Sequence, residues 1–247
     1  MDRRLGAAAA MMRAEQPIKL FLSMPHPCPY LPEEEATTLV IDPDLVMNPS
    51  LLMKLTRTGF RRSGDMIYRP HCARCAACVS VRVSATQFRS TRSQRRVWRR
   101  NLDVEVTPEP AEFNAEHFEL YLKYQAARHP SSSMYDPDPE KYESFLISER
   151  ANTDFYLLRI AGKLAGVAVA DRLADGLSAV YTFFDPALTK RSLGTFAILW
   201  ELNHARNLGL DWVYLGYWID ACKKMSYKTR FMPAQGYIEN RWQPLKR

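Results

Sequence analysis

Three cysteines stand two residues apart at Cys72, Cys75 and Cys78, and Cys28 offers a fourth thiol. Thiolates at this spacing can converge on one ion, which is why structural zinc and iron–sulfur sites use it. A second C-x-x-C pair is missing, and cysteine is also one of the residue types most often buried as a free thiol. The spacing therefore predicts either a metal site on Cys28, Cys72, Cys75 and Cys78 or a group of buried thiols.

Arginines dominate the same part of the chain. Residues 54–102 contain thirteen Lys or Arg and one acid, Asp65, a net charge of +12, whereas the whole chain carries +7 and the remainder −5. All nine bases from Arg69 to Arg100 are arginine, whose planar guanidinium suits phosphate better than an ammonium does. This charge distribution indicates a polyanionic partner.

A helix over residues 91–101 gives the arginines a common face. Thr91 and Gln94 stand at capping-box spacing, and the following arginines recur at intervals of three and four. No acid lies between Met66 and Leu102 to pair with them, and no base-reading motif occurs, so we expect recognition of a nucleic-acid backbone. The predicted phosphate-binding residues are Arg89, Arg92, Arg95, Arg96, Arg99 and Arg100.

The second half of the chain has the pattern of an α/β (α+β) fold. Alternating apolar residues predict three antiparallel strands over residues 155–160, 164–171 and 177–184. A helix over 192–207 and a further strand over 212–217 then imply a crossover and a mixed sheet. The helix opens on Arg191-Ser192-Leu193-Gly194, an R-x-x-G string that is suggestive of the GCN5-related acyltransferase architecture.

The first half predicts a smaller, basic domain. Short strands are expected over 19–21, 37–41, 66–69, 79–83 and 102–106, and a helix over 49–58. Pro108 and Pro110 mark the expected boundary, which gives an N-terminal domain of residues 17–108 and a C-terminal domain of residues 109–247. Two further helices are expected over 112–128 and 142–148, with residues 129–139 as a loop long enough to lie over a site.

Composition and targeting signals narrow the class of protein. With 247 residues and 47% hydrophobic residues, the chain is long enough for one large or two small globular domains. Residues 1–16 are expected to be a disordered leader, because their apolar run is too short for a signal peptide. No stretch of about 18 uncharged apolar residues occurs, so no membrane span is expected. Five cysteines without disulfides fit the reducing cytoplasm.

Several strings of the sequence occur together in one known family. They are Cys28 to Leu31 (CPYL), Gly59 to Gly64 (GFRRSG), Tyr68 to Cys78 (YRPHCARCAAC), Phe88 to Arg96 (FRSTRSQRR), Ser178 to Pro186 (SAVYTFFDP), Tyr214 to Ile219 (YLGYWI) and Met225 to Lys228 (MSYK). From about Pro17 to Trp242 the chain resembles the bacterial aspartate/glutamate leucyltransferases, which are related to the arginyl-tRNA–protein transferases.

This resemblance implies an activity, its partners and its location. Leucine would pass from leucyl-tRNA to the α-amine of proteins that begin with Asp or Glu, which marks them for N-end rule degradation in the cytoplasm. Neither CoA nor ATP is expected, because an aminoacyl ester is already activated. The alternatives are an arginyl-tRNA donor, an acyl-CoA N-acetyltransferase, and a non-enzymatic RNA-binding protein.

The resemblance leaves the metal question open. Eukaryotic relatives are thought to hold an iron–sulfur cluster through a paired cysteine motif and an adjacent downstream pair. Here Leu31 stands where the partner of Cys28 would be, and the downstream thiols are spaced C-x-x-C-x-x-C. No cofactor is expected to be required for catalysis, whereas a structural zinc ion or iron–sulfur cluster stays a hypothesis.

Side chains for the transfer itself follow from its chemistry. The nucleophile is the substrate's own amine, so the protein has to position it and accept a proton. The expected catalytic residues lie on the predicted strands or at their ends: Asp171, Tyr181, Asp185, Tyr214 and Tyr217. An acidic first residue or the tRNA end requires a cation or a helix start. The expected substrate-binding residues are Arg61, Arg62, Arg69, Arg191 and Gly194.

Overall fold

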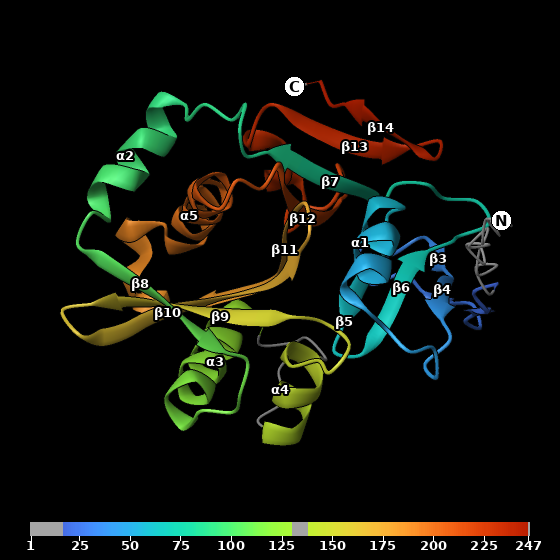
Figure 1. Cartoon of the computed structure of the whole chain (residues 1–247), viewed down its shortest axis with the longest axis horizontal. Coiled ribbons are helices and arrows are strands. Elements are labelled where there is room, and N and C mark those ends of the chain that lie inside the picture. Colours follow the sequence, from blue (N-terminus) through green and yellow to red (C-terminus); the bar gives the residue numbers. More distant parts are fainter. Residues whose placement is uncertain (1–16, 130–137, 247) are drawn as a thin grey trace, which may run out of the picture.

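An eight-stranded mixed sheet forms the larger part of the molecule (Figure 1). The structure, a computed structural model, describes residues 17–129 and 138–246. The strand order is β14-β13-β7-β12-β11-β10-β9-β8. The strands are β7 (Val79–Ser84), β8 (Val104–Pro110), β9 (Thr153–Ile160), β10 (Lys163–Leu173), β11 (Gly176–Phe184), β12 (Trp212–Trp218), β13 (Ala234–Ile238) and β14 (Arg241–Pro244).

The predicted meander and crossover are confirmed. Strands β9, β10 and β11 pair antiparallel, and their inward residues, such as Val167, Val169 and Phe183, are fully buried. The hairpin between β9 and β10 turns on Ala161 and Gly162, both with positive φ, as a tight two-residue turn requires. Helix α5 (Leu193–Asn207) then returns the chain so that β12 lies parallel to β11. The fold is therefore an α/β fold with the mixed sheet that the sequence predicted.

Helices cover both faces of this sheet (Figure 1). On one face, α3 (Ala115–Arg128) and α4 (Pro139–Leu146) pack Leu120, Tyr121 and Tyr142 against β9 to β11. On the other face, α5 lies against the sheet and α2 (Arg92–Arg100) packs on α5. The predicted capping box is present, since the Thr91 hydroxyl accepts from the Gln94 N–H while the Gln94 side chain accepts from the Thr91 N–H.

A second, four-stranded sheet lies at one end of the large sheet, in the order β1-β4-β6-β5 (Figure 1). Helix α1 (Pro49–Arg57) buries Leu52 and Leu55 with Ile41 and Ile67 of this sheet. The four strands of this sheet are β1 (Leu20–Leu22), β4 (Thr38–Ile41), β5 (Arg61–Ser63) and β6 (Met66–Pro70). Strands β2 (His26–Pro27) and β3 (Glu35–Ala36) form a separate two-stranded sheet.

The expected division at residues 108 and 109 falls inside β8. Pro108 and Pro110 lie within that strand, which is possible because β8 is the edge of the sheet and pairs with β9 alone. Strand β7 and helix α2, both N-terminal to the prolines, belong to the larger sheet and its covering layer. The part of the chain that forms the four-stranded sheet ends near Pro70 instead.

Two basic side chains of the +12 block are held inside the fold: Arg57 of α1 contacts the large sheet, and Arg82 packs within that sheet. Arg57 donates to Asp175 at 2.8 Å, and the Arg82 guanidinium lies between the Trp212 and Trp242 rings, 3.7 and 4.3 Å from their centroids. Part of the +12 block therefore holds the fold together and is not available to a polyanion.

Two expected segments lie outside the described residues: the leader, 1–16, and most of the loop, residues 130–137 of 129–139. Within residues 17–129 and 138–246, none of the helices has the length and apolar character that crossing a membrane requires.

Candidate functional site

The parallel pair at the centre of the sheet separates partway along its length. Strands β11 and β12 pair over Gly176–Trp212, Leu177–Val213 and Ser178–Tyr214 only, although both strands continue beyond this point. Strand β12 then carries an irregularity between Tyr214 and Gly216, where its pairing with β7 shifts register. We call the space where β11 and β12 separate the strand opening.

Arg61, from β5 of the small sheet, fills part of the strand opening. Its guanidinium donates to Ser178 Oγ and to the Tyr214 carbonyl, both at 3.4 Å, and also to the Ala179 carbonyl. A Cβ at Gly216 would lie 3.0 Å from Arg61 Cζ, and Gly216 has a φ of +78°. Glycine is thus required there by both the backbone conformation and the close approach of Arg61. The small sheet thereby supplies a cation between two strands of the large one.

A buried lysine lies next to this cation. Lys228, in the short helix η2 (Ser226–Arg230), is 4% exposed, and its ammonium donates to the Tyr217 carbonyl at 2.5 Å. Burial, assisted by the positive charge of Arg61, lowers the pKa of Lys228 to about 7. Lys228 therefore loses its proton much more readily than an exposed lysine, which suits it to accept one during a reaction.

A buried carboxyl group approaches the same region from α5. Glu201 is fully buried, and neither of its side-chain oxygens has a hydrogen-bond partner among the described residues. Burial raises the pKa of Glu201 to about 8, and the charge of Arg61 opposes that rise. Glu201 is thus protonated at neutral pH, and its unpaired oxygens are costly unless something else bonds to them.

The sequence patterns did not single out Lys228 or Glu201 as functional. Lys228 ends the Met225 to Lys228 string, and Glu201 lies in a helix, so both read as ordinary polar residues. Their burial is the signal, and the charge that acts on both of them comes from Arg61, which is far from them in the sequence. Perturbed titratable groups that gather in this way are typical of catalytic sites.

Two expected catalytic residues, Asp171 and Asp185, are engaged elsewhere. Asp171 forms an ion pair with Arg62 in which both side chains are almost fully buried, at 2% and 3% exposure. Asp185 caps η1 (Pro186–Arg191) by accepting from the Ala187 N–H at 2.9 Å, and it pairs with Lys123. Both carboxylates therefore have structural partners that account for their positions.

The three expected catalytic tyrosines have buried or partly buried hydroxyl groups. Tyr214 donates to Asp175 at 2.8 Å, and Tyr181 accepts from Gln125 at 3.2 Å. Tyr217 donates to the Gly59 carbonyl at 3.0 Å, and its own carbonyl accepts from Lys228. Of the three tyrosines, Tyr217 is the one that contacts Lys228, the buried amine that can accept a proton.

The expected substrate-binding residues do not converge on one place. Arg61 lies in the strand opening, whereas Arg62 is held by Asp171. Arg69 donates to the Thr58 carbonyl at 3.0 Å and lies over the Phe60 ring. Arg191 makes a bidentate pair with Asp103, at 2.6 and 2.9 Å. Gly194 lets α5 approach Phe184, because a Cβ there would lie 3.0 Å from that ring.

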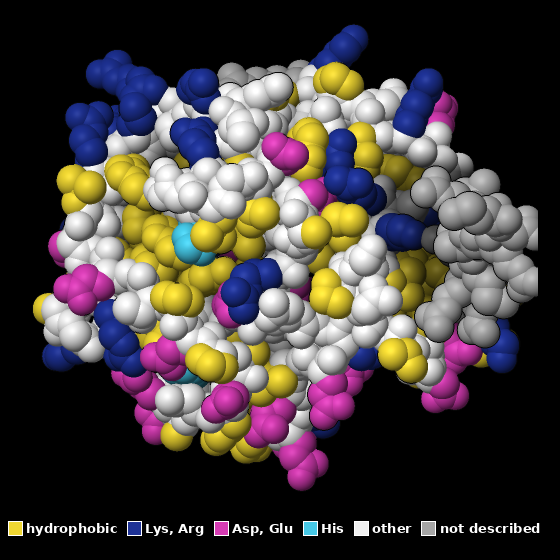
Figure 2. All heavy atoms as spheres, in the orientation of Figure 1, with side chains coloured by type: hydrophobic (Ala, Val, Ile, Leu, Met, Phe, Trp, Pro, Cys, Tyr) yellow, Lys and Arg dark blue, Asp and Glu magenta, His cyan; other side chains and the backbone are white. Residues whose placement is uncertain are grey.

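The expected phosphate-binding residues form an exposed basic face on and beside α2. All six are exposed, and none forms an ion pair with an acid in the described part of the chain; they are Arg89, Arg92, Arg95, Arg96, Arg99 and Arg100. Figure 2 shows basic side chains gathered at the upper left, where Figure 1 has α2, while acidic side chains gather below, around α3 and α4. We call these six residues the arginine face.

The four expected metal ligands line one pocket of about 220 Å³, which also touches Tyr68 and Tyr217. No three His, Cys, Asp or Glu side chains within residues 17–129 and 138–246 are placed to hold a metal ion. Burial and the neighbouring thiols raise the pKa of Cys78 to about 12. As positioned, the residues do not fit a zinc or iron–sulfur site, which requires converging thiolates.

Similar proteins cover nearly the whole chain. This chain is 47% identical over 225 residues to an aspartate/glutamate leucyltransferase of Pseudomonas fluorescens (strain Pf0-1). The match covers 91% of this chain and 96% of that relative. The chain is 49% identical to a protein of the same name from Hahella chejuensis, over 88% of this chain and 93% of that one. A solved structure, the C-terminal domain (DUF2156) of a protein described as a lysylphosphatidylglycerol synthetase from Agrobacterium fabrum, superposes with a TM-score of 0.48 at 14% identity, covering 78% of this chain and 62% of that one.

Both halves of the chain also match family models. The model described as "Arginine-tRNA-protein transferase, N terminus" matches residues 26–96, and the one described as "Arginine-tRNA-protein transferase, C terminus" matches residues 116–238. The first match spans the cysteines and most of α2, and the second spans the strand opening with Glu201 and Lys228. Since the two matches follow each other in order along one continuous fold, the chain belongs to the arginine-tRNA-protein transferase family.

Proposed function

We propose that this protein transfers leucine from leucyl-tRNA to the N-terminal α-amine of proteins that begin with Asp or Glu. The observation that carries the proposal is the combination, in one chain, of the arginine face with a buried amine, Lys228, at the strand opening. The first feature suits an RNA backbone, and the second suits aminolysis of an ester. The choice of leucine and of acidic acceptors rests on the name shared by relatives that are 47% and 49% identical.

In the proposed reaction the substrate amine attacks the carbonyl carbon of the leucyl ester. The new C–N bond forms, the C–O bond to the tRNA ribose breaks, and the amine loses a proton while the ribose oxygen gains one. We assign the acceptance and return of that proton to neutral Lys228. Its pKa of about 7 is matched to this exchange, because a base is most effective when its pKa lies near the working pH.

Arg61 is our candidate for the positive charge that meets an acidic first residue. Of the four arginines expected to bind substrate, it is the one beside both Lys228 and Glu201. Three of its hydrogen bonds go to the strands, so its charge is held in a fixed position. A fixed cation at the reacting centre costs no reorganisation when the substrate binds.

Neither ATP nor CoA is part of this proposal. The ester bond of an aminoacyl-tRNA already supplies the driving force for amide formation. We further propose that the thiols of the 220 Å³ pocket act as free thiols, because three converging ligands are not formed by the described residues. A cytoplasmic location would suit both the charged tRNA donor and the five free cysteines.

The test is a transfer assay with charged tRNA. The purified protein is given tRNA charged with radiolabelled leucine, arginine or phenylalanine, and peptides that begin with Asp, Glu or Lys. We expect label from leucine alone, on the Asp and Glu peptides alone. Label from arginine would make the protein an arginyltransferase.

Two outcomes would overturn the proposal as a whole. No transfer from any charged tRNA would leave an RNA-binding protein. Tight binding of acetyl-CoA in calorimetry, with acetylation of the same peptides, would indicate an acyl-CoA N-acetyltransferase.

A further inference from the structure

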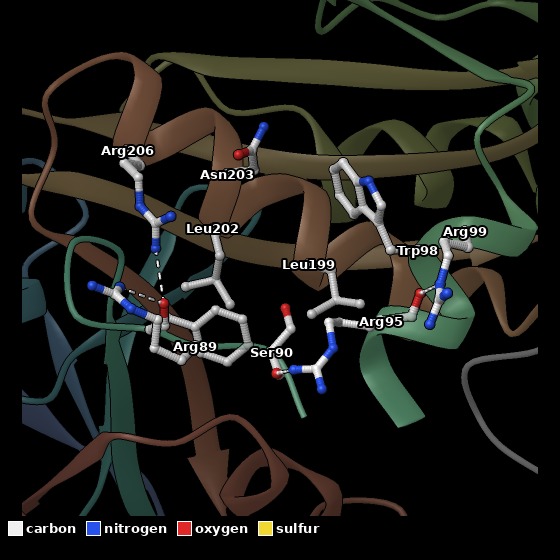
Figure 3. A pocket seen from close by; sticks show the side chains of 10 residues that line it. Arg89, Ser90, Arg95, Trp98, Arg99, Leu199, Leu202, Asn203 and Arg206 are labelled. Carbon is white, nitrogen blue, oxygen red and sulfur yellow. Dashed lines mark hydrogen bonds between the residues drawn. The ribbon is translucent and has the colours of Figure 1, made fainter. Parts of the chain in front are cut away.

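A groove of about 500 Å³ runs between α2 and α5, on the side of α5 that faces the arginine face (Figure 3). Its floor is apolar and consists of Phe88, Trp98, Leu199 and Leu202. Phe88 and both leucines are buried beneath it, and Trp98 is half-buried. The volume lies within the range of sites that take small organic groups.

Arginines line the rim of this groove. Arg206 donates to the Ala85 and Phe88 carbonyls, and Arg89 donates to the Phe88 carbonyl as well (Figure 3). Arg95 and Arg99 stand along α2 on the other side, where Arg95 donates to the Ser90 carbonyl. A guanidinium has five N–H groups, so each of the four keeps donors free.

The lining contains no acid. Its ten residues include four arginines, and the two remaining polar side chains, Ser90 and Asn203, can both donate and accept hydrogen bonds. An apolar floor with an aromatic edge, a rim of guanidinium groups and two neutral polar side chains is the set of groups that recognises a nucleotide. The floor takes the face of the base, the cations take the phosphate, and the neutral polar groups take the base edge.

We propose that this groove binds one unpaired nucleotide of the tRNA, in addition to the phosphate contacts made by the arginine face. The proposal rests on the proposed function for the identity of the RNA as tRNA. It also departs from the expectation of pure backbone recognition, because a base would enter the groove.

The acidic protein substrate is a poorer fit to the groove. Its terminal amine and first side chain have to lie at the reacting ester. Glu201, which approaches the strand opening, is directed into the protein and is fully buried, whereas Asn203 and Arg206 are exposed on the groove side of α5. Helix α5 therefore separates the groove from the proposed reacting centre.

The test fills the groove without changing its charge. Asn203 is exposed, lines the groove and makes no side-chain hydrogen bond with the described residues, so Asn203→Trp should fold normally. Asn207→Trp is the matched control, because Asn207 is exposed on the same helix and does not line the groove. Binding of deacylated tRNA, a short single-stranded RNA and a blunt RNA duplex is measured for the wild type and both variants.

We expect Asn203→Trp to weaken binding of tRNA and of the single strand by about tenfold, the usual loss when one base is prevented from stacking. Duplex binding should be unchanged, and so should the dependence of tRNA binding on salt, because no charge is removed. Asn207→Trp should bind all three RNAs as the wild type does. A second pair of variants changes one arginine in the rim, Arg95→Gln, and one outside it, Arg92→Gln. Arg95→Gln should weaken binding of the single strand more than Arg92→Gln does, whereas the two variants should bind the duplex equally.

Three results would overturn the proposal: unchanged tRNA binding by Asn203→Trp, an equal loss in Asn207→Trp, or an equal loss for duplex and single strand. A raised KM for the peptide with unchanged tRNA binding would also overturn it and would give the groove to the protein substrate. Because the RNAs carry no amino acid, these results do not depend on transfer. Failure of the proposed function would appear separately, as absence of leucine transfer by the wild type.

Discussion

Arg62 and Asp171 form a buried ion pair that joins the two sheets. Arg62 Nη2 lies 2.7 Å from Asp171 Oδ1, and the Thr153 hydroxyl donates to the same oxygen at 2.8 Å. Arg62 also donates to the Leu146 carbonyl at 3.1 Å, so β5, α4, β9 and β10 meet at one guanidinium. Arg61, the residue before Arg62 on β5, lies in the strand opening. The Arg62–Asp171 ion pair therefore fixes the position of the strand that carries Arg61.

Removing the negative charge of this pair should destabilise the protein. Asp171→Asn leaves the Arg62 charge buried and unpaired, and we expect a loss of about 3–5 kcal/mol in the free energy of unfolding. Urea unfolding followed by circular dichroism measures it. The control is Glu116→Gln, which breaks the solvent-exposed pair with Arg159 and should cost at most about 1 kcal/mol. Equal effects of the two variants would contradict the anchoring role.

Lys228 should be needed for transfer because it can be neutral. Lys228→Arg keeps a cation that stays protonated, so we expect kcat for leucine transfer to fall by roughly 10²–10⁴-fold. Lys223→Arg, at an exposed lysine nearby, should leave kcat unchanged. In the wild type, kcat/KM should rise with pH through about 7 as Lys228 loses its proton. A Lys228→Arg enzyme with normal kcat would rule out Lys228 as the proton acceptor.

Glu201 should make the stability of the protein depend on pH. Its pKa is about 8 in the folded state, against about 4.3 for an unfolded chain. Between these values the folded protein holds a proton that the unfolded chain has released, so the free energy of unfolding falls as pH rises.

Glu201→Gln removes that dependence. Relative to wild type, the variant should gain stability steadily from about pH 4.3 to 8 and by a constant amount above 8, reaching several degrees in Tm. Thermal unfolding of both proteins at matched pH values measures the difference. A difference that does not change with pH would mean that Glu201 titrates normally.

The arginine face should govern the salt dependence of tRNA binding. Replacing Arg92, Arg95, Arg96 and Arg99 with Gln should weaken binding at low salt. The slope of log K against log salt should fall by roughly 0.7–0.9 for each phosphate that the variant no longer neutralises. Arg241→Gln, at an exposed arginine paired with Glu239, is the control. An unchanged slope in the fourfold variant would remove the arginine face from the tRNA-binding surface.

The cysteines should not be needed as metal ligands. Protein prepared without oxygen should contain neither zinc nor iron in stoichiometric amount by elemental analysis, and chelator treatment should leave transfer unchanged. Stoichiometric metal that disappears on replacing Cys72, Cys75 and Cys78 with Ser would show instead that these thiols converge in the loaded protein.

Local sequence patterns determined much of the fold. Helix α2 and its capping box follow from Thr91 and Gln94, and the strands β9 to β11 follow from alternating apolar residues and from turns such as Gly162. These features depend on residues within one or two turns of each other, so the sequence contains them directly. The strings shared with the family and the exposed arginine face also depend on residues that are close together in the sequence.

The chemistry of the strand opening was decided by tertiary structure. The sequence could not indicate that Asp171 would form an ion pair with Arg62, 109 positions away. Nor could it indicate that Lys228 and Glu201 would both be buried near Arg61. A pKa depends on desolvation and on charges that approach through space, and neither is encoded in spacing along the chain. The sequence by itself therefore determined the family, the mixed sheet and the basic helix, while the packing of β5 and η2 onto the separated strands decided which residues can exchange a proton.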